Sequence, residues 1–189
     1  MGRGHRQPTF YYDLGSPECY LMAETVMSAL DVVPEWEPVL ARGVGGLNLE
    51  PDRAAIERRA ADEKLLPLRW PRAWPPDTRQ AMLAATYAKR VGRAVAFSLA
   101  AFRQAFAAGR DLADESTVLL AGAACELHPS ALRKGIVLRS VGEALEQATA
   151  RALAAGVCDL PALGLGAEVF AGDDAVVRVA SALRAPAYQ

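Results

Sequence analysis

The stretch Thr9-Phe10-Tyr11-Tyr12-Asp13-Leu14-Gly15-Ser16-Pro17-Glu18-Cys19 leads from a predicted strand directly into a predicted helix. The aromatic run at 9–12 favours a strand, which the turn residues at 13–15 end. Ser16 is a preferred helix cap, Pro17 suits the first helical position, and Glu18 adds an acidic first turn. We predict that the helix continues to about residue 30 and that a second strand lies near 36–40. Strand, helix and strand of these lengths indicate a βαβ unit with a parallel strand pair.

The rest of the chain divides into a helical block and a return to strands. Helices are predicted over 51–64, 77–92 (with Asp77 as the cap), up to 109, 114–127, a short turn from Pro129, and, from the capping box Ser140-Val141-Gly142-Glu143, up to Gly156. A hairpin over 160–165 and 168–170 and a last helix over 173–183 follow. The order βαβ, helices, ββα predicts an α/β thioredoxin fold interrupted by a large all-helical insertion. We assign 1–45 and 156–189 to the thioredoxin-like domain and 46–155 to the insertion.

Composition narrows the classes of partner. Of 189 residues, 52% are hydrophobic and 23% charged, with a net charge of −1, so the charge balance predicts no bulk electrostatic attraction to nucleic acid or to an anionic membrane. The segment Met1–Pro8 is polar and no signal peptide follows it, nor does any apolar run approach the roughly 18–20 residues of a membrane span. We therefore expect a cytoplasmic protein. Its three cysteines are too few for a disulfide scaffold, and Cys125 with His128 lacks a second pair for a metal site.

The segment Ser16-Pro17-Glu18-Cys19 carries the most specific chemistry. Thioredoxin-like oxidoreductases place Cys-x-x-Cys between the first strand and the first helix, where the unpaired N–H groups of the helix stabilise a thiolate. Here serine takes the first position and cysteine the second. Ser16 cannot form a disulfide, but its hydroxyl can donate to the thiolate of a bound cofactor. The same residues also suit an ordinary helix start without function.

Four segments together resemble the DsbA-like superfamily, most closely 2-hydroxychromene-2-carboxylate isomerase and kappa-class glutathione transferase. They are Phe10-Tyr11-Tyr12-Asp13-Leu14-Gly15-Ser16-Pro17, Trp74-Pro75-Pro76-Asp77-Thr78, Gly156-Val157 up to Pro161, and Phe170-Ala171-Gly172-Asp173-Asp174. The resemblance covers nearly the whole chain. It implies a glutathione-dependent isomerase or transferase acting on an aromatic or unsaturated electrophile. The cofactor would be glutathione or another low-molecular-weight thiol, the other partner a small-molecule substrate, and a homodimer is one candidate assembly.

The resemblance also implies roles for particular residues. Catalytic Ser16 would face the sulfur of the thiol, and Leu160, before a cis Pro161, would pair its backbone with the cysteinyl part of the cofactor. Asp173 and Asp174 would lie near the γ-glutamyl end, where a carboxylate can pair with an ammonium group. The substrate pocket would be bordered by Trp74 and Asp77. No residue is expected to bind a metal.

The chain departs from the pattern of these relatives at three positions. Ala175 stands in place of an arginine, Asp77 in place of an asparagine, and Asp159 in place of a glycine two residues before the proline. Two other hypotheses therefore stay open. One is a thiol-disulfide oxidoreductase that uses Cys19 as its redox residue, alone or with Cys158. The other is a family member that binds a thiol or a partner without turnover.

Overall fold

The computed structural model describes residues 7–185, so the polar segment 1–6 and residues 186–189 lie outside the described part. A 3₁₀ turn spans Ala41–Gly43, and a π-helical turn spans Arg103–Ala107. In chain order the main elements are β1 (Thr9–Tyr12), α1 (Pro17–Ala29), β2 (Glu35–Pro38), α2 (Arg53–Asp62), α3 (Arg79–Arg90), α4 (Ala94–Phe102), α5 (Glu115–Ala124), α6 (Pro129–Ile136), α7 (Arg139–Ala154), β3 (Ala162–Leu165), β4 (Glu168–Ala171) and α8 (Ala175–Arg184).

The four strands form one sheet in the order β2-β1-β3-β4. β1 pairs with β2 in parallel, with Phe10 opposite Trp36, and with β3 antiparallel. β3 and β4 make the predicted hairpin. The βαβ unit, the succession of helices and the closing ββα unit are therefore confirmed, and the chain has the thioredoxin fold expected from its element order.

Aromatic side chains of β1 begin the core. Phe10 and Tyr12 point to the same face of the strand and are fully buried, as the two-residue period of a strand requires. Their rings stack at 5.2 Å, and Trp36 of β2 packs edge-on against Phe10 at 5.0 Å. The Tyr12 hydroxyl lies 2.6 Å from the Ser98 hydroxyl of α4. This hydrogen bond ties the sheet to the inserted helices.

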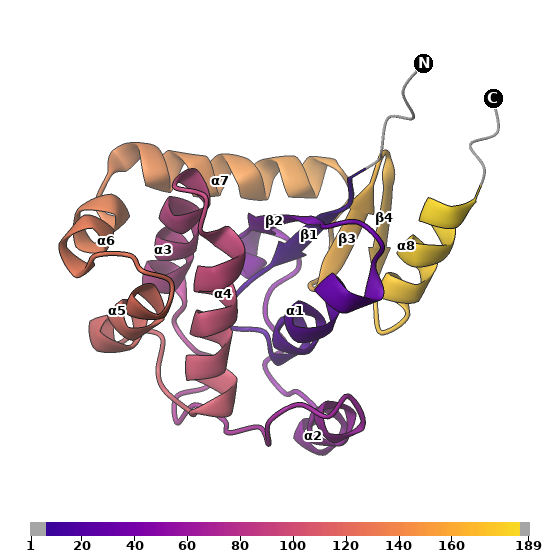
Figure 1. Ribbon diagram of the computed structural model, residues 1–189, viewed down its shortest axis with the longest axis horizontal. Helices are drawn as coiled ribbons and strands as arrows, with labels where there is room; N and C mark the ends of the chain where they lie inside the picture. The colour runs from indigo at the N-terminus through magenta and orange to yellow at the C-terminus, as the bar shows by residue number, and fades with distance from the viewer. Residues whose placement is uncertain (1–6, 186–189) are drawn as a thin grey trace.

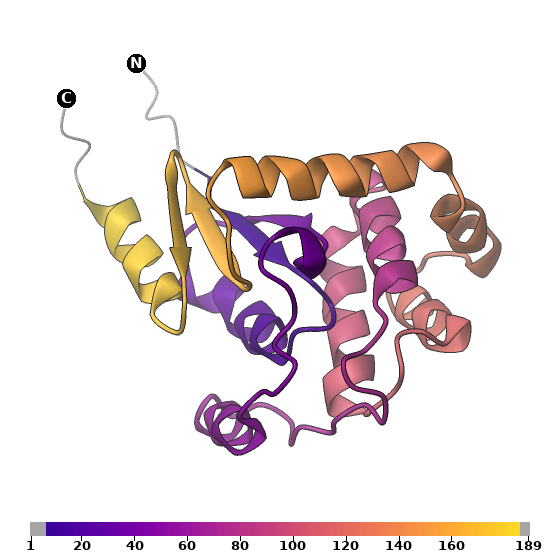
Figure 2. The same cartoon turned by 180° about the vertical axis from the view of Figure 1, so that it is seen from behind.

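The inserted helices gather beside the sheet. α3, α4, α5 and α6 pack together at one end of the molecule, and α7 extends from that group to the sheet, whereas α8 lies at the other end (Figures 1 and 2). α8 packs on β3, β4 and α1, and α7 packs on β2. One cluster of buried residues includes members of both the sheet and the insertion. Within residues 7–185 the buried core therefore shows no boundary at 45/46 or 155/156, and the division into two domains stays a prediction.

Two helix starts differ from the prediction. α7 begins at Arg139 with Leu138 as its cap, and no side chain caps it, so the capping box at 140–143 is wrong. Ser140 lies inside the helix, where its hydroxyl accepts from Arg90 of α3, and Glu143 pairs with Arg139 at 2.7 Å. α3 begins after Thr78 rather than Asp77, although the Asp77 carboxylate still accepts a hydrogen bond from the N–H of Arg79.

No helix within residues 7–185 is long and apolar enough to cross a bilayer. In the same described residues, no group of three or more histidine, cysteine, aspartate or glutamate side chains lies close enough together to hold a metal ion. Cys125 is buried, and the His128 ring caps α6 by accepting from the N–H of Ser130.

Candidate active site

A cavity of about 380 Å³ lies between the start of α1, the loop after the 3₁₀ turn, the loop before β3 and the loop before α8. Segments far apart in the sequence meet here. Four of the predicted site residues line it: Ser16, Leu160, Pro161 and Asp173. The full lining is Ser16, Glu18, Gly45, Gly46, Leu47, Asn48, Asp159, Leu160, Pro161, Gly172 and Asp173.

Ser16 is the cap of α1 and is almost fully buried. Its hydroxyl oxygen accepts from the N–H of Cys19 at 3.1 Å, which satisfies one of the orphan donors of the helix. Its hydroxyl proton is donated to the Glu18 carboxylate at 3.0 Å. Glu18 was expected only as an acidic first-turn residue, and the structure shows it as the partner of Ser16 in the cavity.

The loop before β3 faces Ser16 across the cavity. The Leu160–Pro161 peptide is cis, as the resemblance implied. The N–H of Leu160 donates to the Asp159 carboxylate at 2.8 Å. The backbone donor that would pair with a cysteinyl ligand is thus bonded within the chain. The Trp74–Pro75 peptide is also cis.

Asp13 joins three segments of the chain: the turn before Ser16, the 3₁₀ turn and the start of α3. Its side chain is buried, with one carboxylate oxygen accepting from the N–H of Gly15 and the Thr78 hydroxyl, and the other from the N–H of Ala41, each at 2.9 Å. Burial raises the pKa of the Asp13 carboxyl, and the three donors act in the opposite direction. Asp13 therefore holds the turn before Ser16 in contact with the 3₁₀ turn and with the start of α3.

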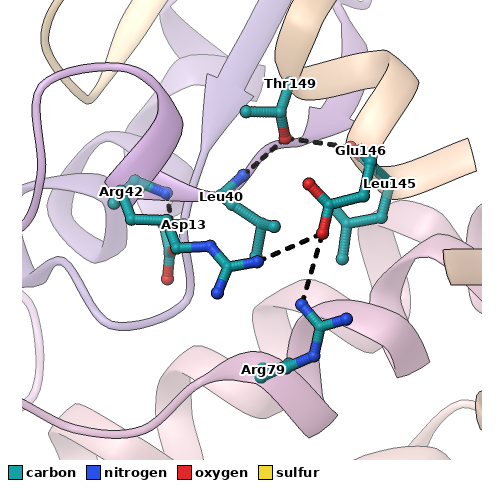
Figure 3. Close-up of polar contacts among 8 residues, drawn as sticks. Asp13, Leu40, Arg42, Arg79, Leu145, Glu146 and Thr149 are labelled. Carbon is teal, nitrogen blue, oxygen red and sulfur yellow. Dashed lines mark hydrogen bonds and ion pairs between the residues drawn. The ribbon is translucent and has the colours of Figure 1, made fainter. Parts of the chain in front are cut away.

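Helix α7 supports the same 3₁₀ turn from its other side. The Thr149 hydroxyl accepts from the N–H of Leu40 and donates to the carbonyl of Leu145, each at 2.9 Å. Glu146 lies between Arg42 of the turn, at 3.1 Å, and Arg79 of α3, at 3.4 Å (Figure 3). The inserted helices thus position the chain just before the cavity loop 45–48.

Gly45 lets this loop approach the loop before β3. Its φ is +115°, and a Cβ at this position would lie 2.2 Å from the carbonyl oxygen of Cys158. No side chain fits such an approach to a backbone oxygen. The glycine therefore determines how closely the two walls of the cavity stand.

The two predicted aspartates before α8 differ in their position. Asp173 lines the cavity and pairs with Arg59 of α2, whose guanidinium also contacts Glu63 at 3.0 Å. Asp174 is the cap residue of α8 without a capping hydrogen bond, and its side chain pairs with Arg178 at 3.5 Å. Only Asp173 therefore belongs to the lining.

Trp74 and Asp77 lie outside the lining of this cavity. The Trp74 indole N–H donates to the carbonyl of Leu49 at 3.0 Å, and its ring packs edge-on against Trp70 at 5.4 Å. Arg53 of α2 lies 4.6 Å over the Trp70 ring. These contacts hold the proline-rich loop to α2, and a substrate-binding role for Trp74 and Asp77 stays a prediction.

The cysteines are not arranged as a redox pair. Cys19 is fully buried, and burial raises the pKa of its thiol. Cys125 is buried in the insertion, and Cys158 is exposed. Because the thiolate is the reactive form, a raised pKa and the absence of exposed surface both oppose nucleophilic chemistry at Cys19.

Alkylation of the folded protein with iodoacetamide near neutral pH is expected to modify Cys158 and to leave Cys19 unmodified until the protein unfolds. The raised pKa means that the thiolate fraction of Cys19 is below that of an ordinary thiol at this pH. Peptide mass analysis over time, with and without urea, measures this. A Cys19→Ser variant should be modified at the wild-type rate; labelling of native Cys19 as fast as Cys158 would revive the oxidoreductase hypothesis.

Sequence reasoning missed Asp13, Glu18 in its contact with Ser16, and the loop 45–48. Gly45-Gly46 was the available signal for the loop, since adjacent glycines mark a special backbone. For Asp13 the signal was weaker, because its partner Thr78 lies 65 residues away.

Comparison with known proteins agrees with this geometry. The family model of the DSBA-like thioredoxin domain matches residues 9–184, so the chain belongs to the DSBA-like thioredoxin family. A comparison with curated protein sequences gave no match.

Several solved structures are similar to the chain. A 2-hydroxychromene-2-carboxylate isomerase has a TM-score of 0.80 at 21% identity, over 93% of each chain. A probable DsbA oxidoreductase from Streptomyces coelicolor has a TM-score of 0.74 at 18% identity, over 98% of this chain and 94% of that one. The cytosolic disulfide reductase DsbM from Pseudomonas aeruginosa with GSH has a TM-score of 0.65 at 14% identity, over 95% of this chain and 100% of that one. At these identities the similarity establishes the fold.

Proposed function

We propose that the chain is a thiol-dependent isomerase or transferase acting on an aromatic or unsaturated electrophile, and that its cavity binds a low-molecular-weight thiol. The observation that carries the proposal is the meeting of Ser16, at the start of α1, with the cis Leu160–Pro161 peptide in one cavity. The similarity to 2-hydroxychromene-2-carboxylate isomerase and to a reductase solved with GSH supports it. A cytoplasmic location is part of the same proposal.

Each residue of the cavity would have a separate role in binding or activating the thiol. A bound thiol supplies a nucleophilic sulfur for addition to an electrophilic carbon. The start of α1, with its partial positive charge, would stabilise negative charge that develops on the sulfur, and Ser16 would hold the sulfur in place. The backbone of Leu160 would orient the cysteinyl part of the thiol. Asp173 would accept a hydrogen bond from a donor at its far end.

The oxidoreductase alternative lacks a comparable observation in its favour. It requires an accessible thiol of lowered pKa, whereas Cys19 is buried and the pKa of its thiol is raised. The alternative of a member without turnover shares the thiol site with the proposal. It differs in predicting binding without catalysis.

A Ser16→Ala variant is expected to lose most of its thiol binding, because the only side-chain contact for the sulfur in this proposal is removed. Titration of ¹⁵N-labelled protein with 2-mercaptoethanol, read at the amides of Cys19 and Leu160, measures this. The variant also loses its helix cap, at about 1 kcal/mol, so its unfolding must be measured beside it. A Ser16→Thr variant keeps both hydroxyl and cap and should retain binding. Full binding by folded Ser16→Ala would refute the proposal.

The reaction class follows from the stoichiometry of the thiol. An isomerase regenerates its thiol, so thiol far below the substrate concentration should support complete conversion of 2-hydroxychromene-2-carboxylate as a trial substrate. A transferase would consume one thiol for each turnover. Thiol binding with no conversion of this or other unsaturated electrophiles would favour the member without turnover.

A further inference from the structure

Both groups that would receive the thiol are already bonded to carboxylates of the chain. A serine hydroxyl has one proton and two acceptor lone pairs. In Ser16 the proton is donated to Glu18 and one lone pair accepts from the N–H of Cys19. What Ser16 still offers a ligand is therefore an acceptor, which suits an S–H group and does not suit a thiolate.

In the loop before β3, the backbone donor is also bonded to a carboxylate of the chain. The N–H of Leu160 is donated to the side chain of its neighbour, Asp159, at 2.8 Å. A ligand carbonyl or carboxylate that approached Leu160 would compete with a charged acceptor held one residue away. Hydrogen bonds to charged groups are the stronger ones, so the internal bond has the advantage.

The charge of the lining has the same sign throughout. Three carboxylates line the cavity, those of Glu18, Asp159 and Asp173, and among the described lining residues there is no lysine or arginine. The nearby cation, Arg59, is paired with Asp173 and with Glu63. The cavity thus presents three carboxylates, and the two donors that would receive the thiol, the Ser16 hydroxyl and the N–H of Leu160, are bonded within the chain.

We infer that this site takes a thiol without net negative charge, either cationic or neutral and rich in hydroxyl donors, whose S–H donates to Ser16. The inference rests on the proposed function and deepens it by naming the class of thiol. Ammonium or hydroxyl donors of the ligand would bind the free acceptor positions of Glu18, Asp159 and Asp173. A thiol with carboxylates, such as glutathione, would meet like charge at each of these positions.

The test uses three small thiols that match in size and differ in charge: cysteamine (cationic), 2-mercaptoethanol (neutral) and 3-mercaptopropionate (anionic). At about pH 6.5 all three carry a protonated thiol, because an ordinary thiol has a pKa of about 8.5. Titration of the ¹⁵N-labelled full chain is read at the amides of Cys19 and Leu160. The expected result is binding of cysteamine and 2-mercaptoethanol, with 3-mercaptopropionate weaker by about tenfold or more.

Two neutralising variants and one control show where the preference arises. Asp159→Asn and Glu18→Gln should each reduce the preference several-fold, since each removes one negative charge from the lining. Glu143→Gln makes the same charge change on the exposed surface of α7 and should leave the preference unchanged. If Glu143→Gln reduced the preference against 3-mercaptopropionate as much as the two lining variants do, the net charge of the protein alone would explain the preference, and the inference would be overturned.

The possible failures are distinguishable. Tightest binding of 3-mercaptopropionate at these amides would overturn the charge inference and leave the thiol site standing. Equal binding of ethanolamine, which has a hydroxyl in place of the thiol of cysteamine, would show recognition of the ammonium alone and overturn the inference. If none of the three thiols, nor glutathione, shifts the amides, the proposed function fails and the inference with it.

Discussion

Replacing Asp13 by alanine is expected to lower the free energy of unfolding by about 3–5 kcal/mol, because three buried donors lose their acceptor at once. The N–H groups of Gly15 and Ala41 and the hydroxyl of Thr78 all donate to this carboxylate at 2.9 Å. Each unsatisfied buried group costs about 1–3 kcal/mol. Thiol binding should weaken in the same variant, since Asp13 holds the turn before Ser16 to the 3₁₀ turn and to the start of α3. Urea unfolding measures the change.

Two further variants make this result specific. Asp13→Asn keeps an oxygen for Gly15 and Thr78 but turns an amide N–H₂ toward the N–H of Ala41, so it should cost about 1–3 kcal/mol. Asp111 is an exposed aspartate that accepts from the N–H of Ala113 at 2.9 Å. Asp111→Ala should cost about 1 kcal/mol or less. If Asp13→Ala were no more costly than Asp111→Ala, the role assigned to Asp13 would be wrong.

The difference in the free energy of unfolding between the wild-type protein and Asp13→Asn should depend on pH, and the sign of this dependence follows from the pKa of Asp13. Burial raises the pKa of Asp13 in the folded state above the unfolded value of about 3.9. A carboxyl of this kind contributes most to stability when it is protonated, and it loses that contribution as the pH rises through its folded pKa. The free energy of unfolding of the wild-type protein, measured relative to that of Asp13→Asn, should therefore fall as the pH is raised from about 3.9 through the folded pKa of Asp13.

Gly45→Ala is expected to destabilise the protein by about 3 kcal/mol, or to displace the cavity loop with loss of thiol binding. The backbone has a φ of +115°, and the added Cβ would lie 2.2 Å from the carbonyl oxygen of Cys158. A positive φ costs a residue with a Cβ about 1–2 kcal/mol, and overpacking adds about 1–3 kcal/mol. Because the carbonyl oxygen of Cys158 belongs to the backbone, no change of side-chain rotamer can relieve the contact.

The neighbouring residue provides the matched control for Gly45→Ala. Gly46 has a φ of +96°, and a Cβ built there meets no atom within 4 Å. Gly46→Ala should therefore cost only the backbone term of about 1–2 kcal/mol and should retain thiol binding. Paired urea unfolding and thiol titrations compare the two variants. Equal effects on stability and on binding would show that the approach of the two loops does not control the cavity.

Much of the fold could be predicted from local signals. The aromatic strand at 9–12, the Ser16-Pro17 helix start and the final hairpin determined the element order, and the order determined the fold. The capping box at 140–143 was wrong, since the helix begins at Arg139 and the Ser140 hydroxyl accepts from Arg90 of another helix, a tertiary contact that has no local pattern.

The candidate site was predicted in part. Ser16, Leu160, Pro161 and Asp173 line the cavity, whereas Asp174, Trp74 and Asp77 lie outside its lining, and the roles implied for all of them stay predictions. The contact of Ser16 with Glu18 and the role of Asp13 depend on side-chain orientation and on partners distant in sequence, for which periodicity gives no signal. Loop 45–48 lies beside the loop before β3 because Gly45 allows a close approach to Cys158, a residue more than 100 positions away in the sequence.

The most direct test is a crystal structure of the chain soaked with 2-mercaptoethanol. We expect a sulfur atom within hydrogen-bonding distance of the Ser16 hydroxyl oxygen, between the start of α1 and the loop that contains Leu160 and Pro161. A thiol found only as a mixed disulfide on exposed Cys158, with no sulfur beside Ser16 at saturating concentration, would contradict it.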